Sequence, residues 1–495
     1  MSDIDSDEED SLRASPTPSV RDGGLPQHQI EVQLGHLTFS SLICSGNMAR
    51  AEIDEDEENE YNVWTTPDCA GSAHVTTCRS WFYFAVRGGQ VGETIGITVM
   101  NSNIQNKLYK KGYKPVWRGS TTSPRWVPLP KRVYTSVDDE DYQIRWEHTF
   151  TAEEEVQFAF CYPSSLEESE ERIAACEQAV LDPAVAEKIY FKSETLMNSL
   201  EGRPMRLLTL SSPAGMRRAQ EPPIPELFPE GRADGARTFK GKPIIFISCR
   251  VHPGETPAQH VFNGLLDFLM RTHDPRAAAL RARYVFKLVP ILNPDGVARG
   301  HYRTDTLGQN LNRFYHDPTP ELHPTIYAVK KYLLERAREG LLHMYIDLHA
   351  HATRRGCFVF GNNTATTESL IETVTFAKLI AMNSPVFDFN QCNYTVCATT
   401  LCFLPVARPV KLRHIVWTGA EHESEGSARR AVEVRQRAGR HLPRDRADAH
   451  LHARVQLQHG ADSQRDQGGE GEGRAAGLAP ARRLGRPEAL HAGRL

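Results

Sequence analysis

The stretch Pro243-Ile-Ile-Phe-Ile-Ser-Cys-Arg-Val251, followed at once by His252-Pro-Gly-Glu255, decides the fold of this chain. Its first part is rich in β-branched and aromatic residues and predicts a buried strand, which Pro253 and Gly254 end abruptly. An imidazole and a carboxylate then lie three positions apart on a tight turn. Zinc binds histidine nitrogen and carboxylate oxygen together, so the turn is a candidate for two metal ligands. Taken alone the pair is a weak signal, because a strand-end turn with a solvated glutamate fits it better.

The residues around this turn alternate between strand and helix patterns. Apolar residues at helical spacing predict helices over residues 260–270, 324–334 and 369–382, and apolar runs predict strands over 284–292 and 344–348. This alternation is typical of an α/β domain with a mainly parallel mixed sheet, which we place at residues 166–393 and expect to be truncated. Sites in such sheets form beyond the carboxyl ends of strands, where His252, Asn293-Pro-Asp-Gly296 and His349 all fall.

The preceding part of the chain has a different pattern. Short alternating apolar segments separated by turn residues predict an all-β sandwich domain over residues 30–163, with strands near 37–43, 80–86, 94–100 and 156–162. Residues 1–28 are acidic and rich in serine and proline, so we expect them to be disordered.

Bulk composition excludes several classes of protein. The chain of 495 residues is 40% hydrophobic and 24% charged with a formal net charge of −4, which gives no strong attraction to nucleic acid or membrane. We find no apolar run long enough to cross a bilayer and no signal-peptide pattern at the amino terminus. The ten cysteines include no Cys-x-x-Cys pair and indicate reduced thiols, so we expect a cytoplasmic protein, with the nucleus as a second compartment.

A third candidate ligand lies in Tyr345-Ile-Asp-Leu-His-Ala-His351. Histidines at i and i+2 on a strand point the same way, so His349, His351 or both are candidates. His252, Glu255 and His349 together would leave one position on zinc for water, which is the layout of a catalytic site.

Cationic side chains gather further along, in the segment that contains Arg303, Asn312 and Arg313. The planar fork of arginine fits a carboxylate through two hydrogen bonds, so the two arginines and the asparagine amide are a candidate clamp for the terminal carboxylate of a peptide. The alternative is a pair of surface arginines in a polar loop.

At this point four ordered motifs resemble those of the zinc carboxypeptidases, and most closely the cytosolic carboxypeptidase branch. They are His252-Pro-Gly-Glu255, Asn293-Pro-Asp-Gly-Val-Ala-Arg-Gly-His-Tyr-Arg303, Gly308-Gln-Asn-Leu-Asn-Arg313 and Asp347-Leu-His-Ala-His351. Upstream, three segments resemble the amino-terminal β-sandwich of that branch: Ser45-Gly-Asn47, Asn62-Val-Trp-Thr-Thr-Pro-Asp-Cys69 and Arg79-Ser-Trp-Phe-Tyr-Phe-Ala-Val-Arg87. Motifs in this order are far more specific than one motif alone.

The resemblance implies one zinc ion on His252, Glu255 and His349. It assigns Arg303 to polarising the scissile carbonyl and stabilising the oxyanion, and Asn312 and Arg313 to binding the terminal carboxylate. It also implies a substrate class and a partner: glutamate removed from polyglutamylated proteins such as tubulin, including the branch-point glutamate, with microtubule association as a consequence.

The carboxyl-terminal part departs from the family. The general-base glutamate expected on a late strand is absent as read, residues 394–417 show no resemblance, and residues 418–495 contain no Ile, Phe, Tyr, Trp, Cys, Met or Lys. Read one base later, Ala453-Arg-Val-Gln-Leu-Gln-His-Gly460 can become Leu-Glu-Cys-Asn-Tyr-Asn-Thr, with the glutamate codon straddling Arg454 and Val455. We therefore interpret 394–495 as an aberrant tail, out of frame from about 418, and a low-complexity disordered tail is the alternative.

This departure leaves three functions open. The first function is that of a zinc metallocarboxypeptidase, as in the family that the motifs resemble. A chain that lacks the general base and the last strands of its sheet would nevertheless be unstable and nearly inactive. The second function is a catalytically inactive module that binds glutamylated tubulin. The third is a zinc deacylase of the aspartoacylase type, against which the upstream sandwich and the asparagine–arginine clamp argue.

Overall fold

The computed structural model describes residues 29–138, 141–352, 354, 356–361 and 367–394, together with the backbone of 411–418. These residues belong to one compact unit that runs to His422. The expected disorder of residues 1–28 and the out-of-frame interpretation of residues 419–495 lie outside the described residues. No described helix is long and apolar enough to cross a membrane.

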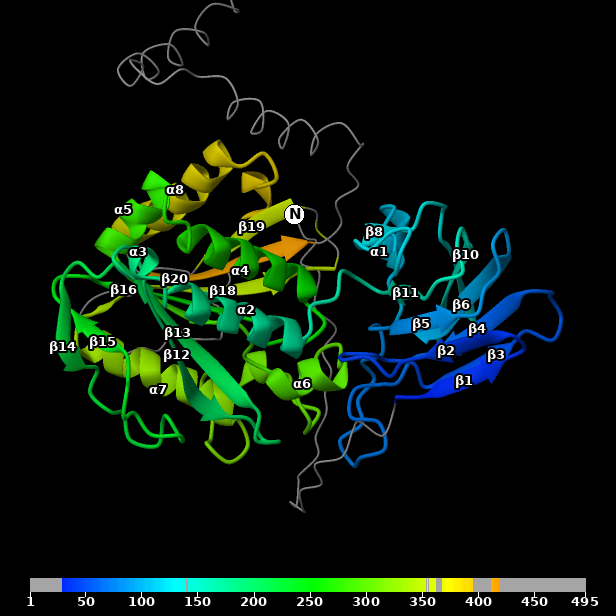
Figure 1. Ribbon diagram of the computed structural model, residues 1–495, viewed down its shortest axis with the longest axis horizontal. Helices are drawn as coiled ribbons and strands as arrows, with labels where there is room; N and C mark the ends of the chain where they lie inside the picture. The colour runs from blue at the N-terminus through cyan, green and yellow to red at the C-terminus, as the bar shows by residue number, and fades with distance from the viewer. Residues whose placement is uncertain are drawn as a thin grey trace, which may run out of the picture. The chain divides into compact units, whose positions relative to one another are not determined.

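The amino-terminal part is a sandwich of two β-sheets (Figure 1). The first sheet has the order β1-β2-β5-β11-β7-β8, with β1 (Glu31–Leu34), β2 (Leu37–Ser40), β5 (Tyr83–Arg87), β11 (Val156–Ala159), β7 (Val116–Gly119) and β8 (Val127–Pro128). The second has the order β3-β4-β6-β10-β9, with β3 (Arg50–Ile53), β4 (Glu60–Trp64), β6 (Thr94–Ser102), β10 (Asp141–Thr149) and β9 (Tyr134–Asp138). The short helix α1 (Asn106–Lys110) follows β6.

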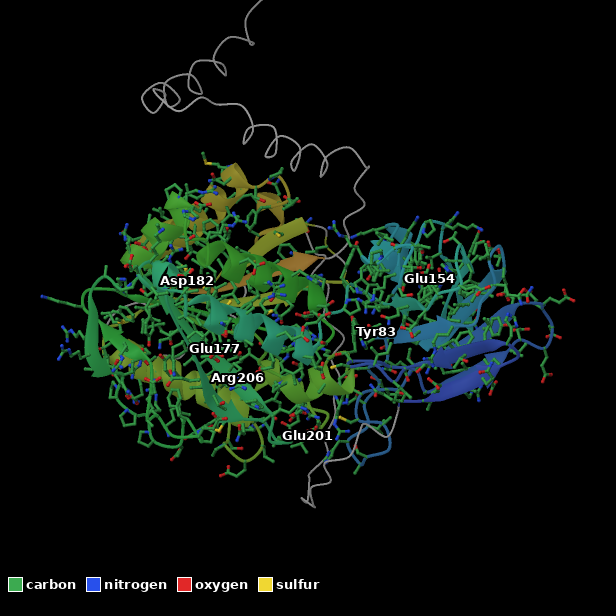
Figure 2. All side chains as sticks on the ribbon, viewed as in Figure 1. Tyr83, Glu154, Glu177, Asp182, Glu201 and Arg206 are labelled. Atoms are coloured by element: carbon green, nitrogen blue, oxygen red, sulfur yellow. The ribbon has the colours of Figure 1, made fainter. Side chains whose placement is uncertain are left out.

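Aromatic side chains fill the space between the two sheets. Phe82, directly before β5, and Trp146 of β10 are almost fully buried and stack with ring centroids 5.7 Å apart. The sandwich also contains the buried carboxylate of Glu154 (labelled in Figure 2). It accepts hydrogen bonds from the backbone N–H and hydroxyl groups of Thr121 and Thr122. Burial acts to raise the pKa of Glu154, but these hydrogen bonds outweigh burial and lower the pKa to about 2. Its negative charge is therefore satisfied within the sandwich.

The second part of the chain is built on a seven-stranded sheet with the order β12-β13-β17-β16-β18-β20-β19. Four neighbouring strands pair in parallel, in the order β17, β16, β18 and β20. The strands on either side of these four pair antiparallel. The bounds are β12 (Tyr190–Asn198), β13 (Pro204–Ser211), β16 (Ile244–Cys249), β17 (Val285–Val289), β18 (Leu342–Ala350), β19 (Gly356–Gly361) and β20 (Lys411–Thr418), and a separate hairpin joins β14 (Met216–Gln220) to β15 (Arg237–Phe239).

Helices cover both faces of this sheet (Figure 1). Successive residues of β16 face opposite sides: Phe246 packs in the core beneath α7, and Ile247 packs in the core beneath α2 and α4. The helices are α2 (Leu166–Ala179), α3 (Pro183–Ala186), α4 (Thr256–Leu269), α5 (Pro275–Arg283), α6 (Pro294–Arg299), α7 (Pro324–Arg338) and α8 (Thr367–Asn383), with short 3-10 turns at η1 (Leu311–Arg313) and η2 (Phe389–Gln391).

The predicted fold class, a mixed α/β domain preceded by a β-sandwich, is confirmed. Residues 394–495 were interpreted as an aberrant or disordered tail, and most of them lie outside the described residues. Within this range, residues 411–418 form β20 between β18 and β19. The run Leu-Arg-His-Ile-Val-Trp in this strand is rich in β-branched and aromatic residues, which favours extended structure whatever its resemblance to a family.

Candidate metal centre

The turn between β16 and α4 places the first two predicted ligands. Directly after the strand, Arg250 adopts a left-handed conformation with φ of 59°, which turns the chain sharply. Its buried guanidinium donates a hydrogen bond of 2.9 Å to the carbonyl oxygen of Pro253 and so braces the turn. Glu255 precedes the first residue of α4 but its side chain does not cap the helix. The carboxylate is therefore free to face the two histidines.

The three predicted ligands converge at the ends of β16 and β18. Oε1 of Glu255 lies 2.7 Å from Nδ1 of His252, and Oε2 lies 3.2 Å from Nδ1 of His349. One ligand atom from each of the three side chains lies within 4.8 Å of the others. The parallel pairing of β16 with β18 explains this convergence, because it brings the carboxyl ends of both strands to the same edge of the sheet.

The far nitrogen of each histidine has its own partner. Nε2 of His252 lies 2.9 Å from Oδ1 of Asn310, and Nε2 of His349 lies 2.8 Å from Oδ2 of Asp347. When each Nε2–H donates to its partner, each Nδ1 presents a lone pair to the centre. Metal-binding histidines are usually held in this way. The donor set of two imidazole nitrogens and one carboxylate therefore fits a zinc ion.

Electrostatics at the centre are dominated by burial and by the three groups themselves. Burial raises the pKa of Glu255, but His252 and His349 outweigh it and hold the pKa well below the usual value. Burial lowers the pKa of His252, and the positive charge of Arg303 adds to this effect. Burial also acts to lower the pKa of His349, but the carboxylates of Asp347 and Glu255 raise it to about 10. The carboxylate is thus ionised and ready to bind a cation.

The predicted substrate-binding residues lie on the segment that follows α6. Arg303 acts electrostatically on His252, and its guanidinium forms no ion pair with any residue that the structure describes. The backbone N–H of Asn312 donates to Oδ1 of Asn310, the same oxygen that faces His252. Arg313 is exposed, and among the described residues it forms no hydrogen bond or ion pair with the three predicted metal ligands. The clamp formed by Asn312 and Arg313 therefore stays a prediction.

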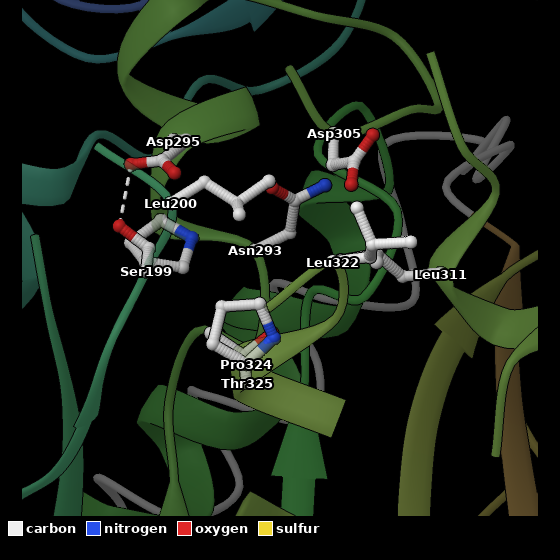
Figure 3. A pocket seen from close by; sticks show the side chains of 10 residues that line it. Ser199, Leu200, Asn293, Asp295, Asp305, Leu311, Leu322, Pro324 and Thr325 are labelled. Carbon is white, nitrogen blue, oxygen red and sulfur yellow. Dashed lines mark hydrogen bonds between the residues drawn. The ribbon is translucent and has the colours of Figure 1, made fainter. Parts of the chain in front are cut away.

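A small pocket lies beside this segment and does not include the predicted ligands (Figure 3). Asp295 accepts hydrogen bonds from Ser199 at 2.7 Å and from Arg203 at 2.8 Å. Across the pocket, Oδ2 of Asp305 is buried and has no hydrogen-bond partner among the described residues. Burial raises the pKa of Asp305 to about 7. The lining residues are Ser199, Leu200, Asn293, Pro294, Asp295, Asp305, Leu311, Leu322, Pro324 and Thr325.

Sequence reasoning missed the two residues that orient the histidines. Asp347 stands two positions before His349 on β18, so the alternation of a strand already placed both side chains on one face. Asn310 lies within the motif Gly308-Gln-Asn-Leu-Asn-Arg313, but its approach to His252 depends on a loop and could not be read from spacing. His351, the other candidate in the motif, lies outside the cluster with its ring against Phe358.

Carboxylates at the centre are few. In the described part of the chain, the carboxylates in contact with the ligand histidines are those of Glu255 and Asp347, and both are engaged with imidazole nitrogens. The segment at 453–460, in which an alternate frame would encode a glutamate, lies outside the described residues. Among the described residues, no third carboxylate forms a hydrogen bond or ion pair with the two ligand histidines.

Comparisons with known proteins agree with the two-part architecture. A family model for zinc carboxypeptidases matches residues 186–395, and one for the cytosolic carboxypeptidase N-terminal domain matches residues 39–161. The chain is 35% identical over 480 residues to cytosolic carboxypeptidase-like protein 5 of Bos taurus, covering 74% of this chain and 54% of that protein. It is 32% identical over 367 residues to cytosolic carboxypeptidase 6 of Homo sapiens, covering 73% and 66%. The chain spans about half the length of the former relative.

Solved structures show the same fold. The chain is similar to a putative carboxypeptidase A from Shewanella denitrificans, with a TM-score of 0.58 at 22% identity, covering 77% of this chain and 89% of that one. A metallo-carboxypeptidase from Burkholderia cenocepacia matches with the same TM-score and identity, covering 77% and 90%. At this level of identity the likeness concerns the fold alone.

Proposed function

Because this chain belongs to the zinc carboxypeptidase family and carries the amino-terminal domain of its cytosolic branch, we propose that it acts on carboxyl-terminal glutamates of polyglutamylated proteins such as tubulin. The proposal includes the branch-point glutamate attached through a side chain. It also places the protein in the cytoplasm, at microtubules when its substrate is there. The observation that carries it is the convergence of His252, Glu255 and His349 close to Arg303, which acts electrostatically on His252 and forms no ion pair among the described residues.

Each residue of the centre has a role in this proposal. His252, Glu255 and His349 would hold one zinc ion, which when bound supplies Lewis acidity to polarise a carbonyl and to acidify water. The guanidinium of Arg303 donates to the scissile carbonyl oxygen and stabilises the negative charge that develops there. Asn312 and Arg313 hold the terminal carboxylate of the substrate, which fixes the last peptide bond beside the centre.

A second candidate function is binding without turnover. It is favoured by the carboxylates of the described centre, which are limited to Glu255 and Asp347 and are both bonded to histidines. Water activation needs a carboxylate that is free to take a proton. If Glu255 and Asp347 are the sole carboxylates at the centre, the chain would bind glutamylated tails and release little or no glutamate.

The experiment separates the functions with one set of substrates. The purified chain, loaded with zinc, is incubated with a linear peptide that ends in three glutamates, a side-chain-branched glutamate peptide, the linear peptide ending in lysine, and an N-acetylated amino acid. Mass spectrometry follows release of glutamate, and calorimetry follows binding.

The expected result is zinc-dependent preference for the glutamate peptides over the lysine peptide. Arg303→Ala should abolish the release of glutamate, and Arg125→Ala, which changes an exposed arginine of the sandwich, should not. Binding of the glutamate peptides without release, unaffected by zinc removal, would favour the binding module. Hydrolysis of the acetylated amino acid alone would favour the deacylase and overturn the proposal.

A further inference from the structure

Both oxygens of a buried carboxylate in the amino-terminal sandwich accept hydrogen bonds from the segment that carries Arg303. Asp68 is 1% exposed, and its Oδ1 accepts the backbone N–H of Tyr302 at 2.6 Å. Its Oδ2 accepts the backbone N–H groups of Arg303 at 2.8 Å and Thr304 at 2.9 Å, and the hydroxyl of Thr304 at 3.1 Å. Four donors on three consecutive residues therefore converge on one buried charge. Such an arrangement fixes the backbone of these residues far more firmly than packing alone.

Asp68 is itself held rigidly by the sandwich. Its backbone N–H donates to the carbonyl oxygen of Cys78 at 2.8 Å, and its carbonyl oxygen accepts the N–H of Thr76 at 2.9 Å. The next residue extends the contact, because Sγ of Cys69 lies 3.0 Å from the carbonyl oxygen of Asp305. The sandwich thus forms hydrogen bonds to the chain at Arg303 and again at Asp305.

The gripped segment rests directly on the metal-binding turn. The N–H of Gly254, between His252 and Glu255, donates to the carbonyl oxygen of Tyr302 at 2.8 Å. A side chain at position 254 would meet that carbonyl oxygen at 2.7 Å, so the two backbones touch. Residues 302–304 are therefore held between Asp68 on one side and the turn with two metal ligands on the other.

We propose that Asp68 is a positioning residue for Arg303, so that the amino-terminal sandwich is a working part of the site. Fixing three consecutive backbone N–H groups fixes the Cα of Arg303 and the direction in which its side chain leaves the backbone. Arg303 has no ion-pair partner among the described residues to orient it, so its aim depends on its backbone. This inference rests on the proposed function, in which the guanidinium of Arg303 contacts the substrate.

The first experiment measures ligand affinity on the full-length, zinc-loaded chain with the tri-glutamate peptide as the probe. Asp68→Ala should weaken binding by about 10- to 100-fold, as expected when a binding group is misplaced by about 1 Å. Asp68→Asn keeps one acceptor oxygen and should fall between the wild type and Asp68→Ala. The double variant Asp68→Ala/Arg303→Ala should bind no worse than Arg303→Ala alone, because both changes remove the same interaction. Additive losses would show that Asp68 does not act through Arg303.

The control is Glu154→Gln. Glu154 is also a buried sandwich carboxylate that accepts two backbone N–H groups and two hydroxyls, but its donors lie on Thr121 and Thr122 within the sandwich. The control should lower the melting temperature about as much as Asp68→Asn and change peptide affinity less than twofold. An equal loss of affinity in the control would reduce Asp68 to general stabilisation and overturn the proposal.

The second experiment is independent of the ligand. Hydrogen exchange of the backbone amides of residues 302–304 should accelerate at least 10-fold in Asp68→Asn, while zinc affinity, measured by chelator competition, stays within twofold of the wild type. Unchanged exchange would overturn the hold of Asp68 on the segment. If the wild type fails to bind the peptide, the proposed function is refuted, and the exchange result still decides whether Asp68 fixes the segment.

Discussion

The pocket of Figure 3 is lined by Asp305, a carboxyl group whose burial disfavours the ionised form. Asp305 is 3% exposed, and one of its oxygens has no described partner. Burial raises its pKa from 3.8 to about 7, although Oδ1 accepts the N–H groups of Leu307 and Gln309. Substituting Asp305→Asn preserves the accepting oxygen and removes the charge. The variant should therefore be more stable than the wild type at high pH.

The magnitude follows from the two pKa values. In the unfolded chain the carboxyl loses its proton near 3.8, whereas the folded chain keeps it until about 7. Folding is penalised increasingly between these values and by a constant amount above them, because the ionised group must then be buried. At about 1.4 kcal/mol per pKa unit, the full penalty is about 4 kcal/mol, of which about 2 kcal/mol accumulates between pH 5 and pH 7.

The assay is urea unfolding of the wild type and Asp305→Asn at pH 5, 6, 7 and 8. The free energy of unfolding of the variant, relative to the wild type, should rise by about 2 kcal/mol from pH 5 to pH 7 and level off by pH 8. A constant offset from the unpaired amide is expected and does not affect this slope. Glu171→Gln, a change of an exposed carboxylate on α2, should show no slope. A pH-independent difference for Asp305→Asn would refute the argument.

The remaining predictions concern the metal centre and the two cores. Asp347→Asn and Asn310→Ala each remove a hydrogen-bond partner of a ligand histidine and should weaken zinc affinity by about 10- to 100-fold in chelator competition; an unchanged affinity would speak against a role in orienting the ligands. Lys287→Met leaves Glu221 buried without its 2.7 Å partner and should cost about 3 kcal/mol in urea unfolding, so a neutral result would mean that the other nearby cations suffice. Phe82→Ala opens the aromatic core of the sandwich and should cost about 3 to 5 kcal/mol, with a cost below about 1 kcal/mol contradicting tight packing there.

Much of the metal centre was predictable because its information is local. His252 and Glu255 share a four-residue turn, and His349 ends a strand whose apolar run is plain in the sequence. The rule that parallel strands end at one edge of a sheet then brings residues nearly a hundred positions apart to one point. Helices over residues 256–269 and 324–338 were likewise recognisable, because hydrophobic periodicity is a property of neighbouring residues.

The sequence by itself determined the alternation of strands and helices around the metal-binding turn, the identity of three candidate ligands and the two-part organisation of the chain. The tertiary structure decided the rest: the insertion of β20 into the sheet, the partners Asn310 and Asp347, the raised pKa of Asp305 and the grip of Asp68 on residues 302–304. Asp68 and Arg303 are 235 positions apart, and nothing in the spacing of either segment refers to the other. Such contacts arise from how whole sheets and loops pack, and burial, which sets pKa values and satisfies buried charges, exists only once that packing is complete.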